Sequence, residues 1–134
     1  MSKQPVLVIG RIFKHYSAEL EKDKYFLIIG FGGHEVGVLV INTDPRRADY
    51  PETLQASQIP LEAGLCDFLH HLSYVNCAEI REFNKTKLNN HLHENSSSVQ
   101  CILPEDILAM ILNRLKNSIM LTLVEKEKYN LIDN

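Results

Sequence analysis

The sequence lacks any long apolar segment. Its longest apolar runs are Pro5–Ile9, Tyr25–Ile29 and Val36–Ile41, whereas a membrane-spanning helix needs about 18 or more consecutive apolar residues. The first of these runs is also too short to form the apolar core of a secretory signal peptide. We therefore expect a cytoplasmic protein with no membrane partner.

Cysteine is scarce, and its positions show no paired spacing. The chain has only Cys66, Cys77 and Cys101, and an odd number without such spacing does not indicate a disulfide framework. Cys77 and Cys101 have apolar neighbours in the sequence, so both are interpreted as small buried hydrophobic residues. This pattern agrees with a reducing compartment.

The chain also lacks an excess of positive charge, since its formal net charge is −3 with the histidines neutral. Proteins that coat duplex nucleic acid need many lysine and arginine contacts to phosphates. Broad electrostatic wrapping of nucleic acid is therefore disfavoured. If the protein handles RNA, we expect a local patch that binds a few nucleotides of a single strand.

Motifs for nucleotide, ester and metal chemistry are missing as well. Gly30, Gly32 and Gly33 are not followed by the Gly-Lys-Ser/Thr of a phosphate-binding loop, and no Gly-x-Ser-x-Gly motif occurs. The histidines and cysteines could be drawn together as a site, for instance His70-His71 with Cys66 and Cys77, or His91-x-His93. They lack the short spacings of well-formed zinc sites, so we expect neither a metal nor a cofactor.

What the sequence does contain is a series of short strands. Strands are predicted over Val6–Phe13, Lys24–Gly30, Val36–Thr43 and Leu72–Phe83. The second and third are separated by Phe31-Gly-Gly-His-Glu, which predicts a hairpin because glycine supplies the positive φ angles of a tight turn. Both are apolar without clean alternation, as in strands covered on both faces.

Irregular segments and one helix complete the prediction. Prolines punctuate residues 44–60 and predict a long surface excursion. Residues 84–88 predict a short polar helix or turn, and residues 91–98 a loop. Pro104-Glu-Asp opens a helix, because proline and acidic residues favour a first turn, and apolar residues follow at helical spacing. Met120–Val124 fits either helix or strand.

We therefore expect one domain, residues 1–134, of the α+β class and mainly β. Several short strands followed by a terminal helix are typical of a small β-barrel with a helix covering one side.

The order of several short motifs resembles a known family. The segments are Gly10-Arg11-Ile12-Phe13, the aliphatic run from Asp23 to Ile29, Val38–Thr43 with its terminal hydroxyl residue, and Phe68–Arg81, in which a serine precedes a strand that ends in isoleucine and arginine. Together with the helix from Pro104, this order resembles the MazF/PemK toxins over about 100 residues. The resemblance implies an SH3-like barrel, a homodimer, metal-independent cleavage of single-stranded RNA and neutralisation by a small antitoxin protein.

The resemblance also assigns roles to residues. Carried over position by position, it places Thr43 at a catalytic hydroxyl position and Arg81 at a catalytic arginine, with Ser73 as a helper in RNA binding. The family's arginine at the start of the second strand is missing, because Lys24-Tyr25-Phe26 stands there. Lys24 can offer a phosphate a point charge, but not the bidentate fork of a guanidinium.

Other residues can replace the missing arginine in space. Arg11 and Lys14 are candidates for RNA binding, and so is the adjacent pair Arg46-Arg47 in the long loop. Imidazole has a reference pKa of about 6.5, which suits proton transfer near neutral pH. His15 is therefore the candidate base for the ribose 2′-hydroxyl.

Each of these residues also has a purely structural interpretation. Arg81 can form a surface ion pair with Glu79 or Glu82, Thr43 can end a strand, and the remaining cations can be solvated. Two functions follow: a toxin-like endoribonuclease, or a catalytically inactive binding module for a protein or nucleic acid. Convergence of Arg11, Lys14, His15, Lys24 and Arg81 with Thr43 favours the first, and scatter favours the second. An unrelated small β protein is the third alternative.

Overall fold

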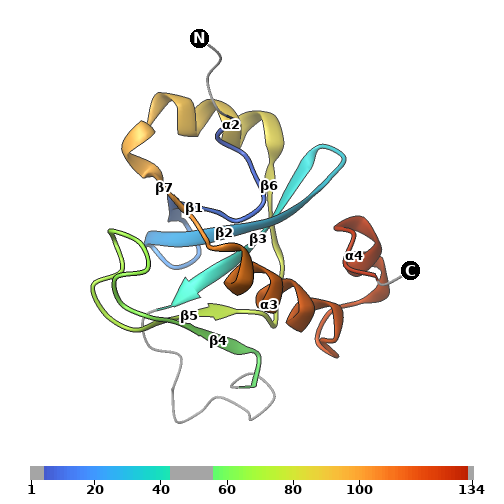
Figure 1. Cartoon of the computed structure of the whole chain (residues 1–134). Helices are drawn as coiled ribbons and strands as arrows, with labels where there is room; N and C mark the ends of the chain where they lie inside the picture. The colour runs from blue at the N-terminus through green and yellow to red at the C-terminus, as the bar shows by residue number, and fades with distance from the viewer. Residues whose placement is uncertain (1–4, 43–55, 133–134) are drawn as a thin grey trace.

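A computed structural model describes residues 5–42 and 56–132. The strands are β1 (Arg11–Ser17), β2 (Lys22–Gly32), β3 (Glu35–Asn42), β4 (Gln58–Leu61), β5 (Ser73–Asn76), β6 (Arg81–Asn84) and β7 (Val99–Ile102). The helices are α2 (Lys85–Glu94), the 3-10 turn η1 (Ser96–Ser98), α3 (Glu105–Lys116) and α4 (Leu123–Lys128). Figure 1 shows them arranged around one curled sheet.

The sheet is antiparallel, with strand order β4-β5-β3-β2-β1-β7. β6 lies off this path and pairs with the first half of β3, from Glu35 to Val38, while β5 pairs with its end at Ile41 and Asn42. Two short strands therefore share one edge of β3, and the sheet curls into a half-barrel. The predicted α+β, mainly β class with a barrel-like sheet and a C-terminal helix is confirmed.

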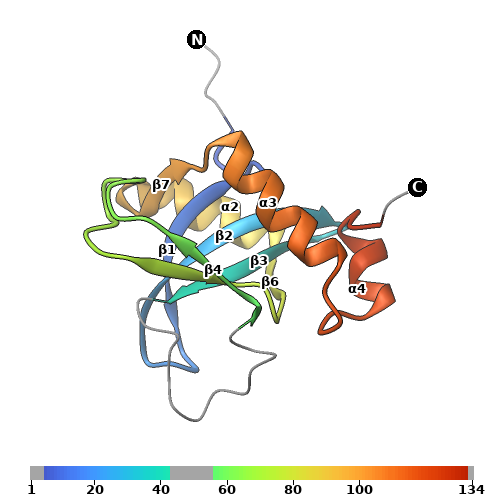
Figure 2. The ribbon, with the colours of Figure 1, turned by 60° about the horizontal axis from the view of Figure 1, so that its bottom comes forward.

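Helices cover both faces of this sheet (Figures 1 and 2). Leu88 and Leu92 of α2 pack in one core with residues such as Phe13, Phe26 and Val38. We call this side the α2 face. The residues of the opposite core include Ile111 and Leu115 of α3, with Leu27 and Leu39 from the sheet.

The central hairpin forms as predicted. β2 and β3 pair from Tyr25↔Ile41 to Gly32↔Glu35, and Gly33 in the turn has a φ of 64°, a value that glycine adopts without steric cost. The central residues of both strands are buried on both faces, because α2 covers one side and α3 the other. This double burial explains the lack of alternation in the sequence.

Several predicted boundaries are wrong. The first strand is Arg11–Ser17, not Val6–Phe13. The predicted strand Leu72–Phe83 is two strands, β5 and β6, separated by a turn at Cys77-Ala78. The turn forms because the Asn76 side chain accepts a hydrogen bond from the Ala78 backbone N–H.

One helix is longer than predicted, and two strands were not expected. α2 runs through the predicted loop, with Asn84 as its N-cap accepting from the Lys87 N–H. β4 lies at the edge of the sheet and contains Pro60. Proline has no backbone N–H to donate, and an edge strand tolerates this because one of its sides has no neighbouring strand. β7 follows the serine cluster, and its four residues are too short to give a periodic signal.

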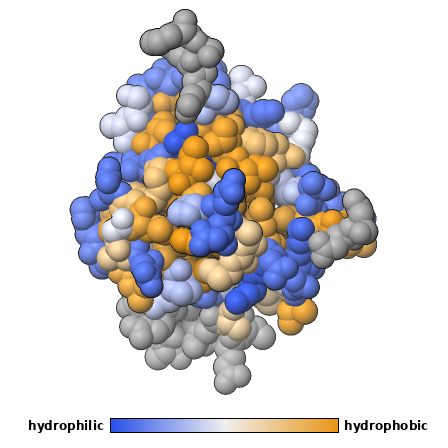
Figure 3. Space-filling view, in the orientation of Figure 1, coloured by the Kyte–Doolittle hydropathy of each residue, from blue (hydrophilic) through white to orange (hydrophobic). Residues whose placement is uncertain are grey.

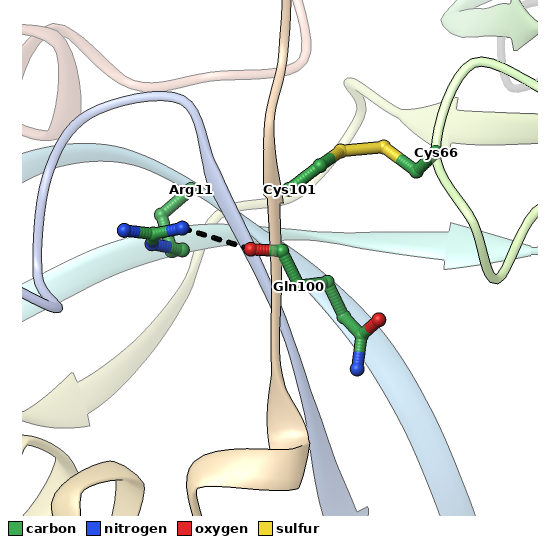
Figure 4. Close-up of a disulfide and its surroundings, with 4 residues drawn as sticks. All are labelled: Arg11, Cys66, Gln100 and Cys101. Carbon is green, nitrogen blue, oxygen red and sulfur yellow. Dashed lines mark hydrogen bonds between the residues drawn. A yellow bond between two sulfur atoms is a disulfide. The ribbon is translucent and has the colours of Figure 1, made fainter.

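The interpretation of the cysteines is also wrong. Cys66 and Cys101 form a disulfide with a Cα–Cα distance of 5.9 Å. It joins the β4–β5 connection to the edge strand β7, as Figure 4 shows, and only the fold brings these two positions together. Cys77 is free and buried, as expected, and burial raises the pKa of its thiol to about 12.

The chain end packs against the hairpin. Tyr129, which follows α4, is buried against Gly30 and Gly37, where a β-carbon on Gly37 would come within 2.7 Å of the tyrosine ring. Glu82 of β6 accepts hydrogen bonds from the Tyr129 hydroxyl and from Lys128 Nζ, the latter at 2.7 Å. Of the part of the chain that the structure describes, no helix is long and apolar enough to cross a membrane.

Candidate nucleic-acid site

Three of the predicted site residues share the α2 face. Arg81 pairs with Val38 of β3, a core residue of this face, and cross-strand partners point to the same side of a sheet. Lys24 lies two residues from Phe26 and His15 two residues from Phe13, and side chains two apart in a strand share a face. His15 and Lys24 are themselves cross-strand partners.

Lys24 lies near the start of β2, where the arginine expected from the family resemblance is missing. Its Nζ donates to Asn42 Oδ1 at 2.9 Å, and Asn42 directly precedes Thr43 in the sequence. Burial, followed by the positive charges of Lys22 and Arg81, lowers the pKa of the Lys24 ammonium. Lys24 and Arg81 are therefore close enough to act on each other electrostatically.

Arg81 is paired with a carboxylate. Its Nη1 lies 2.5 Å from Glu19 Oε2 on the β1–β2 turn, and its Nη2 lies 3.9 Å from Glu79. The hydrogen bond with Glu19 raises the pKa of Arg81 and lowers the pKa of Glu19. Arg81 Nε is buried and has no hydrogen-bond partner among the described residues, so the guanidinium has an unused donor.

An open pocket of about 400 Å³ lies beside Arg81. It is lined by the β1–β2 turn and β6, through Tyr16, Ser17, Ala18, Glu19, Phe26, Arg81, Glu82 and Phe83. Tyr16 is exposed and Phe83 is half-buried. The pocket thus combines the Arg81 guanidinium with three aromatic rings and with the carboxylates of Glu19 and Glu82. A guanidinium beside an aromatic ring can bind a phosphate next to a stacked base.

His15 lies next to this pocket. Its ring packs edge-on against Phe83, with the ring centroids 4.9 Å apart, and its Nδ1 lies 2.7 Å from the Tyr16 carbonyl oxygen. The His15 ring also meets the ring of His91 of α2, at a centroid distance of 4.6 Å. Phe83 therefore connects the imidazole to the pocket that holds Arg81.

Two predicted RNA-binding residues have structural partners. Arg11 Nε donates to the Val6 carbonyl at 3.1 Å, and its Nη1 donates to the Gln100 carbonyl at 2.8 Å (Figure 4). These bonds hold the N-terminal segment against β7. Ser73 is buried, and its hydroxyl faces the His71 carbonyl at 3.4 Å, so it does not present a group to RNA.

The remaining predicted residues do not join the cluster. Lys14 pairs with Tyr25, which packs against the α3-side core, so strand alternation directs Lys14 away from the α2 face. Thr43, Arg46 and Arg47 lie outside the described residues. His15, Lys24 and Arg81 therefore share the α2 face, and neither Arg11 nor Lys14 joins them there.

Sequence reasoning missed Glu19, Phe83 and His91. Glu19 lies 62 positions from Arg81, and no local spacing links them. Phe83 does carry a usable signal, because it lies two residues after Arg81 and must share its face if the segment is a strand. His91 lies on a helix that was predicted to end earlier.

Among the described residues, no group of three or more His, Cys, Asp or Glu side chains could hold a metal ion. In comparisons with known proteins, no family model matches the chain and no curated protein matches its sequence.

Proposed function

We propose that the protein is a toxin-like, metal-independent endoribonuclease that cleaves single-stranded RNA. The observation that carries the proposal is the placement of His15, Lys24 and Arg81 on one face of the sheet beside an aromatic-lined pocket. Metal-free RNA cleavage needs a base for the 2′-hydroxyl, an acid for the leaving oxygen and cations for the phosphate. One imidazole, one ammonium and one guanidinium supply these groups.

Each group has a role in this reaction. His15 takes the proton of the 2′-hydroxyl, and the 2′-oxygen attacks phosphorus. Arg81 and Lys24 bind the phosphate oxygens, and the Lys24 ammonium protonates the leaving 5′-oxygen. Burial lowers the pKa of Lys24, so it releases a proton more readily than an exposed lysine does. The products are a 2′,3′-cyclic phosphate and a 5′-hydroxyl.

Glu19 must give way when RNA binds. Its side chain is 67% exposed, and exposed ion pairs contribute little net stability because water screens them. A phosphate can therefore replace the carboxylate at Arg81.

The resemblance to MazF/PemK toxins extends the proposal to partners. A small antitoxin protein would cover the same face, and the active form would be a homodimer. We place the protein in the cytoplasm, where RNA substrates are, although the Cys66–Cys101 disulfide removes the cysteine argument for a reducing compartment.

The test is incubation of the pure protein with a long single-stranded RNA in excess chelator, beside Arg81→Ala and a matched control. Arg114→Ala is that control, because it removes a guanidinium from α3 on the opposite side of the sheet. We expect discrete cuts from the wild type and from Arg114→Ala, and loss of cleavage in Arg81→Ala.

Intact RNA from folded wild-type protein would contradict the nuclease. The second candidate function, a catalytically inactive binding module, would then be preferred. One observation favours it: Arg81 already has a carboxylate partner, and an acidic segment of a partner protein could occupy the same position. Retained RNA or peptide binding without cleavage would identify this module.

A further inference from the structure

His91 belongs to none of the roles described so far, yet it lies beside His15. The ring centroids are 4.6 Å apart, with the planes inclined by 49°. The two residues come from α2 and β1, which are distant in the sequence. Both side chains are partly exposed, so a ligand can reach this pair.

The hydrogen bonds of His15 determine which of its ring nitrogens is free. Nδ1 lies 2.7 Å from the Tyr16 carbonyl oxygen, and a carbonyl oxygen only accepts, so Nδ1 carries a proton. In the neutral ring Nε2 then has a free lone pair. His15 offers this lone pair to the 2′-hydroxyl.

The hydrogen bonds of His91 place the proton of its neutral ring on the other nitrogen, Nε2. Asn95 Nδ2 donates to the His91 carbonyl oxygen at 2.8 Å, which fixes the orientation of the amide. The same amide nitrogen lies 3.4 Å from His91 Nδ1, so Nδ1 accepts and the proton of the neutral ring is on Nε2. His91 therefore presents an N–H donor.

We propose that His91 is a further catalytic residue, whose Nε2–H donates a hydrogen bond to a non-bridging oxygen of the scissile phosphate while His15 deprotonates the 2′-hydroxyl. The inference rests on the proposed nuclease function and adds a neutral donor to it. An acceptor and a donor side by side match the two groups that RNA presents here, a hydroxyl proton and a phosphate oxygen.

The proton balance of the step is complete. The bond from the 2′-oxygen to phosphorus forms, and the bond from phosphorus to the 5′-oxygen breaks. The 2′-hydroxyl proton moves to His15 Nε2, the Lys24 ammonium gives a proton to the 5′-oxygen, and His91 keeps its proton throughout. His91 thus stabilises the negative charge that grows on the phosphate, as fixed donors do in other enzymes.

The test compares three variants on a short fluorescent single-stranded RNA in excess chelator. His91→Ala removes the donor, His91→Gln replaces it with an amide N–H, and His93→Ala is the matched control. His93 is exposed on the same helix. It points in a different direction from His91, since residues two positions apart in a helix are separated by about 200° around the helix axis. Thermal unfolding of each variant checks that it folds.

We expect kcat to fall about 100-fold in His91→Ala with little change in KM, as when one transition-state donor is removed. His91→Gln should recover most of this loss, and His93→Ala should match the wild type. Wild-type kcat in folded His91→Ala would overturn the role of His91 and leave the nuclease standing. A raised KM with unchanged kcat, or no recovery in His91→Gln, would also overturn it. An inert wild type would overturn the nuclease itself, together with this role.

Discussion

At the scale of single residues, the ion pair between Glu19 and Arg81 would control access to the phosphate position of the proposed nuclease. The carboxylate holds the guanidinium from an exposed turn, so RNA has to exchange one anion for another. The pair therefore lowers RNA affinity without blocking the site. This competition makes the affinity for RNA sensitive to a residue that need not touch RNA.

We predict that Glu19→Gln binds single-stranded RNA up to about fivefold more tightly, because exposed ion pairs contribute little and the gain is correspondingly small. Fluorescence anisotropy with a non-cleavable oligonucleotide measures this. Glu21→Gln removes the same charge from the same exposed turn without contacting Arg81 and should bind like the wild type. Equal gains in both variants would show that only net charge matters.

The site residues were only partly predictable from the sequence. His15, Lys24 and Arg81 could be named because residue type and the motif order pointed to them. Arg11 could not be recognised as structural, because its partners are backbone carbonyls at Val6 and Gln100. Ser73 could not be recognised as buried, since its burial depends on how β5 sits between β3 and β4.

At the scale of elements, strong local sequence patterns predicted the β2–β3 hairpin and the helix from Pro104. The short strands depend instead on pairing between segments that are distant in the sequence. β2 and β3 are apolar runs with glycine between them, and α3 has a clear apolar stripe. β4, β5, β6 and β7 have four residues each, so their pairing partners define them more than their own sequences. The disulfide likewise joins positions 35 residues apart.

The connection between α4 and β6 gives a prediction at this scale. Hydrogen bonds from Lys128 and then Tyr129 lower the pKa of Glu82 in the folded protein. A carboxylate with a depressed folded pKa stabilises the fold above its unfolded pKa of about 4.3, and this contribution is lost as the pH falls through the lower folded value. Glu82→Gln should therefore lower the free energy of unfolding by about 0.5–1 kcal/mol at neutral pH, as for a screened ion pair.

Urea unfolding followed by circular dichroism measures this difference. The difference in the free energy of unfolding between wild type and Glu82→Gln should narrow as the pH falls from about 4 through the lower folded pKa of Glu82. Below that folded pKa both side chains are uncharged. Glu62→Gln, at an exposed position with no ion pair in the described part of the chain, should show no such dependence. A gap that stays constant with pH would show that the Glu82 charge does not stabilise α4.

At the scale of the whole molecule, the curled sheet separates two surfaces with different character. The α2 face carries the site. The connection between α3 and α4 and the start of α4 expose apolar side chains, with Ile119 88% exposed, Val124 74% and Leu123 65%. Figure 3 shows orange, hydrophobic atoms at the lower right of the molecule, on the side where Figure 1 draws α4.

The net charge of −3 then limits how the molecule meets RNA. A protein that neutralises few phosphates releases few counterions, and for single strands the logarithm of the binding constant falls with the logarithm of salt at about −0.7 per phosphate contacted. Lys24 and Arg81 provide two such contacts, so we predict a slope of about −1.4. Arg46 and Arg47, if they also contact phosphates, would bring it to about −2.8.

Anisotropy titrations between low and physiological salt measure the slope. Lys24→Ala should reduce its magnitude by about 0.7, since one phosphate contact is lost, whereas Arg114→Ala on the opposite side of the sheet should leave it unchanged. A slope steeper than about −4, insensitive to Lys24→Ala, would mean that RNA wraps a broad surface outside the α2 face. A slope near −1.4 that loses half its magnitude in Lys24→Ala would instead locate RNA binding at Lys24 and Arg81.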